Sequence, residues 1–155
     1  MTSNVDPVAS VEEQIALLLR LADRNRRRSR RLEHTLERSA HLALRQLEAV
    51  GPLGINEIAD HLRLDASTVT RQVLAMEAAG FVERSRDEND GRRAVITMTD
   101  AGREALAATR AARHSVYSDV LGTWSTDDQQ HLADLLARLN DSLDTHTRAT
   151  DAALA

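Results

Sequence analysis

Residues 65–73 read Asp65-Ala-Ser-Thr-Val-Thr-Arg-Gln-Val73, and this stretch predicts a helix with a polar outer face. Asp65 is a good N-cap, because its carboxylate can accept hydrogen bonds from amides two or three residues further on. Val69 and Val73 lie four residues apart and therefore face inward together. The opposite face carries small side chains and one arginine: Ala66, Ser67, Thr70 and Arg71. Such a face permits close approach to DNA, where hydroxyl groups and arginine contact base edges or phosphates.

A second short helix is predicted just before this one. Its apolar residues recur at i, i+3, i+4 and i+7, which is the helical period: Ile55, Ile58, Ala59 and Leu62. Arg63-Leu64 then forms a tight turn, and Gly51-Pro52 ends an earlier helix predicted over 35–50. Two such helices at a steep angle brace each other, and the second presents its outer face to a major groove.

A long-tipped hairpin is predicted next. Phe81–Arg84 and Ala94–Thr99 have the composition of short strands, and Ser85–Arg93 is a charged loop that contains Asn89-Asp-Gly91. Arginine on such a tip can enter an adjacent minor groove, where the potential is most negative. Four arginines flank this tip: Arg84, Arg86, Arg92 and Arg93. A hairpin that is merely solvated is the alternative interpretation.

The remaining sequence predicts helices on both sides of this core. The helix that begins at residue 8 is apolar on nearly every face between Ile15 and Leu21, so a second chain is a plausible cover for it. A fifth helix is predicted over 100–123. A sixth is capped by Ser125 or Thr126 and carries a leucine stripe at positions 132, 135, 136, 139 and 143. Residues 1–7 are expected to be a disordered lead and 148–155 a frayed tail.

Composition narrows the class of protein. At 155 residues the chain is about one domain long, and its zero cysteines exclude disulfides, thiolate zinc sites and thiol redox switches. Neither a membrane-spanning apolar run nor a basic leader is visible, so a cytoplasmic protein is expected. The net charge of −4 argues against DNA, but residues 20–93 hold 15 Arg against 12 acidic residues. Binding of phosphates needs only such a local excess.

The densest basic stretch, Arg24–Arg31, has two interpretations. It is either the solvated end of the first helix or an arm that faces phosphates.

From about His41 to Gly102 the sequence resembles the MarR family of bacterial regulators. The Asp-x-Arg wing signature, with Thr99 nine residues after Asp90, is specific in this context. The resemblance is carried by these segments: Gly51-Pro-Leu53, Ile55-Asn-Glu-Ile-Ala-Asp-His-Leu62, Ser67-Thr-Val-Thr-Arg71, Met76-Glu-Ala-Ala-Gly-Phe-Val-Glu-Arg84, Asp90-Gly-Arg92 and Val95-Ile-Thr-Met-Thr-Asp-Ala-Gly102.

The resemblance implies a mainly α fold with a small β-hairpin wing. Residues 35–99 would form a winged helix-turn-helix that binds DNA, and 8–34 with 100–147 a helical dimerisation region. The homodimer would bind a pseudo-palindromic promoter site, most often as a repressor. At matching positions, Ser67, Thr68, Thr70 and Arg71 would belong to the recognition helix and Arg92 to the wing, with Asp90 orienting Arg92. Arg86 and Arg93, which flank the wing tip, are the further candidate DNA contacts.

Two features depart from the family pattern. Arg86 and Glu88 stand where family wings often carry prolines, and Gly54 stands where the short helix usually has a Ser or Thr cap.

The resemblance further implies a small aromatic acid as effector, bound between the two parts of the protein. Candidate lining residues are His41, Arg45 and Tyr117, with Arg45 placed to pair a carboxylate. The alternative is that Arg45 braces an interface and His41 is a packed core residue.

Metal and enzyme interpretations are weaker. His34 and His41 share a helix face but lie about 10 Å apart along it, so neither a metal site nor a cofactor is predicted. Asp127-Asp128 is explained as first-turn stabilisation of a helix, and no catalytic constellation is visible. A winged helix used only for protein contact is disfavoured, because Ser67, Thr70 and Arg71 offer no apolar anchor.

Overall fold

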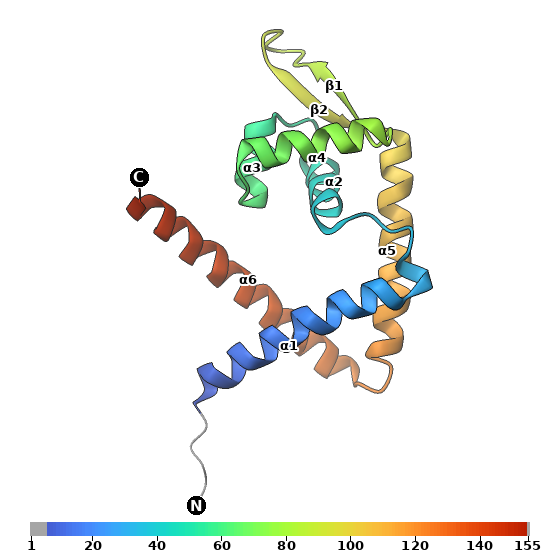
Figure 1. The fold of residues 1–155 in the computed structure, drawn as a ribbon, viewed down its shortest axis with the longest axis vertical. Helices are drawn as coiled ribbons and strands as arrows, with labels where there is room; N and C mark the ends of the chain where they lie inside the picture. Colours follow the sequence, from blue (N-terminus) through green and yellow to red (C-terminus); the bar gives the residue numbers. More distant parts are fainter. Residues whose placement is uncertain (1–5, 155) are drawn as a thin grey trace, which may run out of the picture. The chain divides into compact units, whose positions relative to one another are not determined.

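The computed structural model describes residues 6–154 of the chain (Figure 1). This range forms six α-helices, one 3₁₀ turn and a two-stranded antiparallel hairpin, which confirms the predicted mainly α fold with a β-hairpin wing. The elements are α1 Pro7–Arg28, η1 Arg30–Leu32, α2 Arg38–Val50, α3 Ile55–Leu62, α4 Ala66–Ala78, β1 Val82–Arg86, β2 Ala94–Met98, α5 Asp100–Val120 and α6 Thr126–Leu154.

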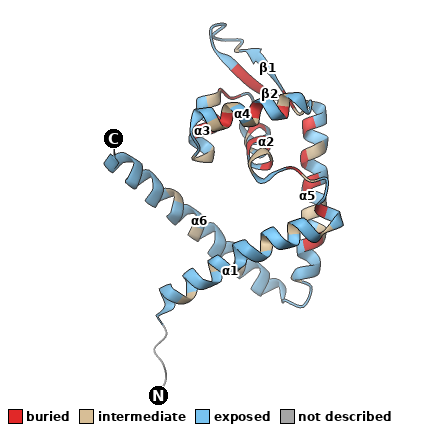
Figure 2. Ribbon diagram, in the orientation of Figure 1, coloured by how far each residue is buried: buried red, intermediate tan, exposed pale blue. Residues whose placement is uncertain are grey.

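The chain divides into two compact units, Met1–His114 and Ser115–Ala155, with the boundary inside α5. The first unit contains the main hydrophobic core, formed by α2, α3, α4, the hairpin and the start of α5 (Figure 2). The side chains of Val69 and Val73 are 0% exposed, so the predicted inner face of α4 is confirmed. The largest fully buried side chains of this unit are aliphatic apart from one threonine: Leu44, Ile58, Val69, Val73, Ile96, Leu106 and Thr109.

The hairpin is attached to the linker between α2 and α3. The β1–β2 register pairs Val82 with Met98 and Arg86 with Ala94. Leu53 adds a short bridge on the other edge of β2. Its N–H donates to the Ile96 carbonyl at 3.2 Å, and the Ile96 N–H donates back at 2.8 Å. Leu53 therefore acts as one residue of a third strand and fixes the base of the wing beside the start of α3.

The ends of the hairpin are joined by Thr99. Its hydroxyl donates to the Gly80 carbonyl at 2.6 Å and accepts from the Gly102 N–H at 3.1 Å, and its own N–H donates to the Phe81 carbonyl at 3.0 Å. Gly80 has φ +77°, the left-handed conformation expected of a residue that ends a helix. Gly102 lies so close to β1 that a Cβ there would sit 2.1 Å from the Phe81 carbonyl oxygen. Only glycine fits at this position.

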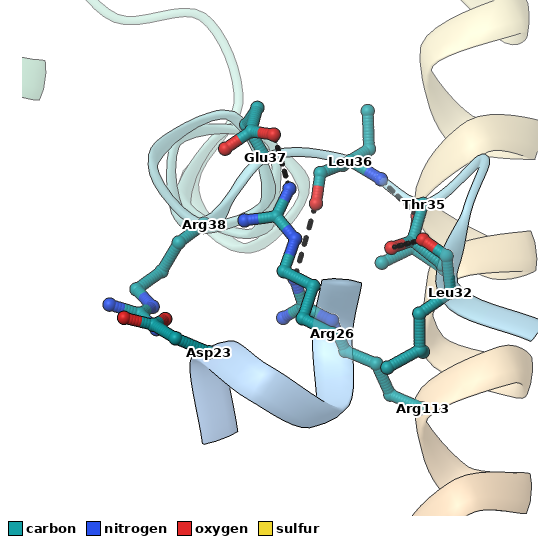
Figure 3. Close-up of polar contacts among 9 residues, drawn as sticks. Asp23, Arg26, Leu32, Thr35, Leu36, Glu37, Arg38 and Arg113 are labelled. Atoms are coloured by element: carbon teal, nitrogen blue, oxygen red, sulfur yellow. Dashed lines mark hydrogen bonds and ion pairs between the residues drawn. The ribbon is translucent and has the colours of Figure 1, made fainter. Parts of the chain in front are cut away.

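The first part of α5 is held against the start of α2. The Leu36 N–H donates to the buried Thr109 hydroxyl at 3.0 Å, and Arg113 donates to the Leu36 carbonyl at 3.2 Å (Figure 3). Arg26 of α1 pairs with Glu37 in the same area. Because the Leu36 backbone is bonded to α5, α2 begins at Arg38, three residues later than predicted.

The N-terminal expectation needs a small correction. Pro7, assigned to the disordered lead, is the first residue of α1, and the Asp6 carboxylate caps this helix by accepting the Val8 N–H at 3.0 Å. Residues 1–5, the rest of that lead, lie outside the described residues.

The C-terminal expectation is wrong, because α6 continues through the segment predicted to fray and ends at Leu154. Arg148 pairs with Asp144 one turn earlier at 3.0 Å, and the Thr147 hydroxyl bonds the carbonyl of Leu143. Ser125, rather than Thr126, caps this helix: its hydroxyl accepts the Asp128 N–H at 3.1 Å. Earlier in the chain, α5 ends at Val120 and not at residue 123. Along residues 6–154, no helix has the length and apolar character to cross a membrane.

Replacement of Gly102 by alanine is expected to destabilise the first unit by about 1–3 kcal/mol, the usual cost of forcing extra volume into a packed site. The new methyl group overlaps the Phe81 carbonyl, so β1 or α5 must move. Urea denaturation measures the loss. Gly91→Ala is the matched control, because a Cβ at Gly91 meets no atom within 4 Å. Equal stability of the two variants would contradict the proposed close contact.

Candidate nucleic-acid interface

Asp65 organises the start of α4. The Asp65 carboxylate accepts the Thr68 N–H at 2.9 Å, the Ser67 hydroxyl at 2.8 Å and the Thr68 hydroxyl at 2.5 Å. These bonds lower the pKa of Asp65 to about 2. The bond from the Thr68 hydroxyl has the largest effect, and the bond from the Ser67 hydroxyl has the next largest. The predicted N-cap is confirmed, and it also fixes the first two hydroxyl groups of the outer face.

The three hydroxyl groups of this face each donate a hydrogen bond to another group of the protein. Ser67 and Thr68 donate to Asp65, and Thr70 donates to the Ala66 carbonyl at 2.7 Å. A hydroxyl group has one donor and two acceptor positions. In this arrangement these side chains therefore present mainly acceptors to a partner.

Arg71 supplies the donors of the same face. It is exposed, and it is the single arginine in the sequence of α4. Its guanidinium makes one long contact of 3.5 Å with the Thr68 hydroxyl. The group is therefore anchored on the face yet retains most of its five N–H donors for a partner.

The wing tip is shaped by two aspartates, Asp87 and Asp90. The Asp87 carboxylate accepts the Asn89 N–H at 2.9 Å, and the Asp90 carboxylate accepts the Arg92 N–H at 3.1 Å. Side-chain acceptors that bond an amide two residues on stabilise turns of this kind. The backbone closes below the tip, where the Asp87 N–H donates to the Arg93 carbonyl at 2.8 Å.

This geometry changes the role expected of Asp90. The sequence predicted that Asp90 orients the Arg92 side chain, but its carboxylate binds the Arg92 backbone. Among the ion pairs found within residues 6–154, none joins the two side chains. Asp90 thus shapes the turn from which Arg92 projects. Arg92 and Arg86 are exposed, and Arg86 ends β1 opposite Ala94.

The Arg93 side chain forms ion pairs with other residues of the same chain. Its guanidinium pairs with Glu57 of α3 and lies 3.8 Å from Asp87. Glu57 also accepts a hydrogen bond from the Gly54 N–H at 2.7 Å. This bond is the largest cause of the lowered pKa of Glu57, and the hydrogen bond from Arg93 is the second. The same carboxylate thus stabilises the start of α3, where Gly54 lacks a capping side chain, and holds the wing.

Sequence reasoning missed Glu57. The available signal was the combination of Gly54 at the cap with an acidic residue three positions later, which is one half of a capping box. Its second partner, Arg93, lies 36 residues away.

The candidate effector residues lie in two units. His41 of α2 is 8% exposed, and its Nδ1 has no hydrogen-bond partner among the described residues. Burial lowers the pKa of His41, and the charges of Arg113, Arg45 and Arg110 lower it further. Arg45 is exposed on α2. Tyr117 belongs to the second unit and is 52% exposed.

A metal site does not emerge from the geometry. Over the described range, no three His, Asp or Glu side chains gather closely enough to hold an ion.

Comparison with known proteins agrees with this fold. The MarR family profile matches residues 36–94. An uncharacterized HTH-type transcriptional regulator of Bacillus subtilis, YxaD, is 36% identical over 140 residues, covering 88% of this chain and 95% of the relative. This chain therefore belongs to the MarR family of transcriptional regulators, which act by binding DNA and are not enzymes.

Solved structures support the same assignment. A probable transcriptional regulator from Pseudomonas aeruginosa is 30% identical, with a TM-score of 0.64 over 83% of this chain and 98% of that one. A MarR family protein from Bacillus stearothermophilus is 25% identical, with a TM-score of 0.69 over 90% of this chain and 99% of that one.

The Asp65 network predicts a pH dependence of stability. Folding lowers the Asp65 pKa from its usual 3.8 to about 2, so its contribution is complete above about pH 4 and is lost as the pH falls through about 2. Asp65→Asn keeps a capping oxygen but has no titrating carboxyl. The stability difference between wild type and Asp65→Asn, measured by urea unfolding, should therefore decline from about pH 5 to about pH 2. A constant difference across this range would contradict the network.

Proposed function

We propose that this regulator represses transcription as a homodimer that binds a pseudo-palindromic promoter site, with α4 in the major groove and the wing beside it. The observation that carries the proposal is the outer face of α4, where fixed hydroxyl acceptors surround one exposed guanidinium. Glu57 and the Leu53 bridge hold the wing to the start of α3 and to the linker before it.

The two kinds of group on α4 would contact different base edges. Acceptor oxygens of Ser67, Thr68 and Thr70 suit the amino groups of adenine N6 or cytosine N4, whereas Arg71 suits guanine or a phosphate. Arg86 and Arg92 would contact the minor groove or its phosphates. We assign Arg93 to support of the wing, because its guanidinium is already paired with Glu57.

The dimer is supported by apolar faces that the single chain leaves uncovered. Within the described residues α1 and α6 contain no buried side chain. The α1 leucines are 45–54% exposed, and Leu135 and Leu143 of α6 are 51% and 54% exposed. Leucine-rich helices seldom stay uncovered in water, since burial of each such side chain contributes about 1.5–3 kcal/mol. A second copy of the chain is the occupant proposed for both faces.

Release by a small aromatic acid is the final part of the proposal. The buried imidazole of His41 lacks a partner at Nδ1 and lies within the electrostatic influence of Arg45, Arg110 and Arg113. A carboxylate bound there would neutralise some of this positive charge, and Arg45 is exposed enough to reach it. Benzoate is the simplest probe: it should bind the wild type and bind Arg45→Ala weakly. Equal binding would contradict this site.

Footprinting upstream of the protein's own gene, repeated over a salt series, is the decisive experiment. A dimer on a two-fold site should protect two half-sites about one helical turn apart, and the affinity should fall steeply with salt. A run-off transcription assay on the same fragment should show lower output when the site is occupied. An affinity that does not change with salt would contradict the proposed contacts with DNA phosphates. Increased transcription would contradict repression.

Arg71→Ala and Arg92→Ala should each weaken DNA binding by about 1–3 kcal/mol while the protein stays folded. If either residue contacts a phosphate, the dependence of log affinity on log salt should also become shallower by about one unit. Arg148→Ala is the control, because this arginine pairs with Asp144 on α6. Wild-type affinity in both test variants would contradict the docking geometry.

Leu18→Glu and Leu135→Glu should shift the protein from dimer to monomer in sedimentation equilibrium. A charge on a buried face is costly, and two-fold symmetry places each change in the interface twice. Leu154→Glu is the matched control, since Leu154 is 82% exposed near the end of α6. A wild-type protein that sediments as a monomer would refute the dimer.

A further inference from the structure

The outer face of α4 carries one large apolar side chain, that of Leu74. This residue is 54% exposed, whereas the buried residues of the same helix are 0–3% exposed. Leu74 follows Thr70 by four residues and Arg71 by three, and residues at these spacings lie on one face of a helix. The face proposed to enter the major groove therefore presents an isobutyl group beside its hydroxyl groups and its guanidinium.

The fold itself does not account for this leucine. The α4 helix joins the hydrophobic core through Val69, Val73 and Met76, and the core formed by residues 6–154 does not include Leu74. Helix propensity does not account for it either, because alanine forms helices at least as well as leucine. Single exposed leucines are common on protein surfaces. The position of this one, next to the side chains proposed to contact DNA, is what points to a role in binding.

The neighbours of Leu74 on α4 leave its side chain accessible. Ala75 is next to it and Ala78 is one turn further on, and both are small and exposed. The acidic residue of this turn, Glu77, pairs with Arg84 of β1 at 3.4 Å, which reduces the repulsion that its charge would exert on phosphates. A base edge can therefore approach Leu74 closely.

The major groove offers an apolar group that suits such a side chain, the 5-methyl group of thymine. The hydroxyl acceptors of the face suit the amino groups of adenine or cytosine, and Arg71 suits guanine or a phosphate. Leu74 is the largest apolar surface of this face. Contact with a methyl group would remove that surface from water, and such burial is favourable.

We propose that Leu74 contacts the 5-methyl group of a thymine in each half-site and is thereby a specificity-determining residue. Its Cα lies about 4.5 Å farther along the helix axis than that of Arg71, at 1.5 Å per residue. The thymine therefore lies within about two base pairs of the one that Arg71 contacts, since base pairs are about 3.4 Å apart. This inference rests on the proposed function and adds to it a preference for one base.

Deoxyuridine substitution in the operator tests the contact. Deoxyuridine pairs with adenine as thymidine does and lacks only the 5-methyl group. Thymines of the protected site are replaced at one symmetric pair of positions at a time, and the affinity of the full-length protein is measured by fluorescence anisotropy. One such replacement should weaken binding about fifteenfold, since burial of one methyl-sized group is worth about fourfold and both half-sites change. A protected half-site without thymine, or wild-type binding indifferent to every replacement, would overturn the proposal.

Three leucine variants assign the effect to one side chain. Leu74→Ala should bind the thymine and the deoxyuridine operators with equal affinity, whereas Leu74→Met keeps a large apolar side chain and should retain most of the preference. Leu42→Ala is the matched control and should keep the full preference, because Leu42 is 44% exposed on α2, outside this face. A preference that survives unchanged in Leu74→Ala would mean that another group contacts the methyl, and would overturn the assignment.

The proposed function and this contact fail in different ways. A wild-type protein that binds its operator with a steep salt dependence, yet is indifferent to the thymine methyl groups, leaves the proposed function intact and overturns the role of Leu74. A wild-type protein that protects no site refutes the proposed function, and the role of Leu74 with it.

Discussion

The contact between Glu57 and Arg93 is the interaction on which the arrangement of the proposed DNA-binding face depends. It joins the first turn of α3 to the base of the wing, two segments far apart in the sequence. Because Gly54 cannot cap α3 with a side chain, Glu57 must also complete the start of this helix. Loss of one carboxylate would thus loosen both the helix that braces α4 and the wing beside it. The backbone bridge between Leu53 and Ile96 also joins the wing to the linker before α3.

Much of this architecture was predictable, because local sequence patterns and local interactions coincide there. The spacing of Val69 and Val73, the cap at Asp65 and the left-handed Gly80 each depend on residues a few positions apart. The family resemblance then supplied the arrangement of these elements. Element ends were less predictable where distant contacts set them, as at the start of α2, where α5 holds the backbone of Leu36.

The roles of individual charged residues were harder to predict. Arg92 and Arg93 are neighbours of the same type, yet one projects from the tip and the other pairs with a residue 36 positions away. Periodicity contains no information about such a pair. The same limit applies to Asp90, whose carboxylate binds a backbone amide rather than a guanidinium.

The hydrogen bonds by which Thr99 joins the two ends of the hairpin affect how the proteins of this family can diversify. Thr99 and Gly102 fix both ends of the hairpin against the end of α4 and the start of α5, while Asp87 and Asp90 shape the tip through contacts that stay within the tip. The segment 88–92, which excludes Arg93 and its pair with Glu57, is therefore mechanically separable from the rest of the domain. Its length and charge can change over evolution, or by grafting from a relative, without disturbing the helices that carry the proposed recognition face.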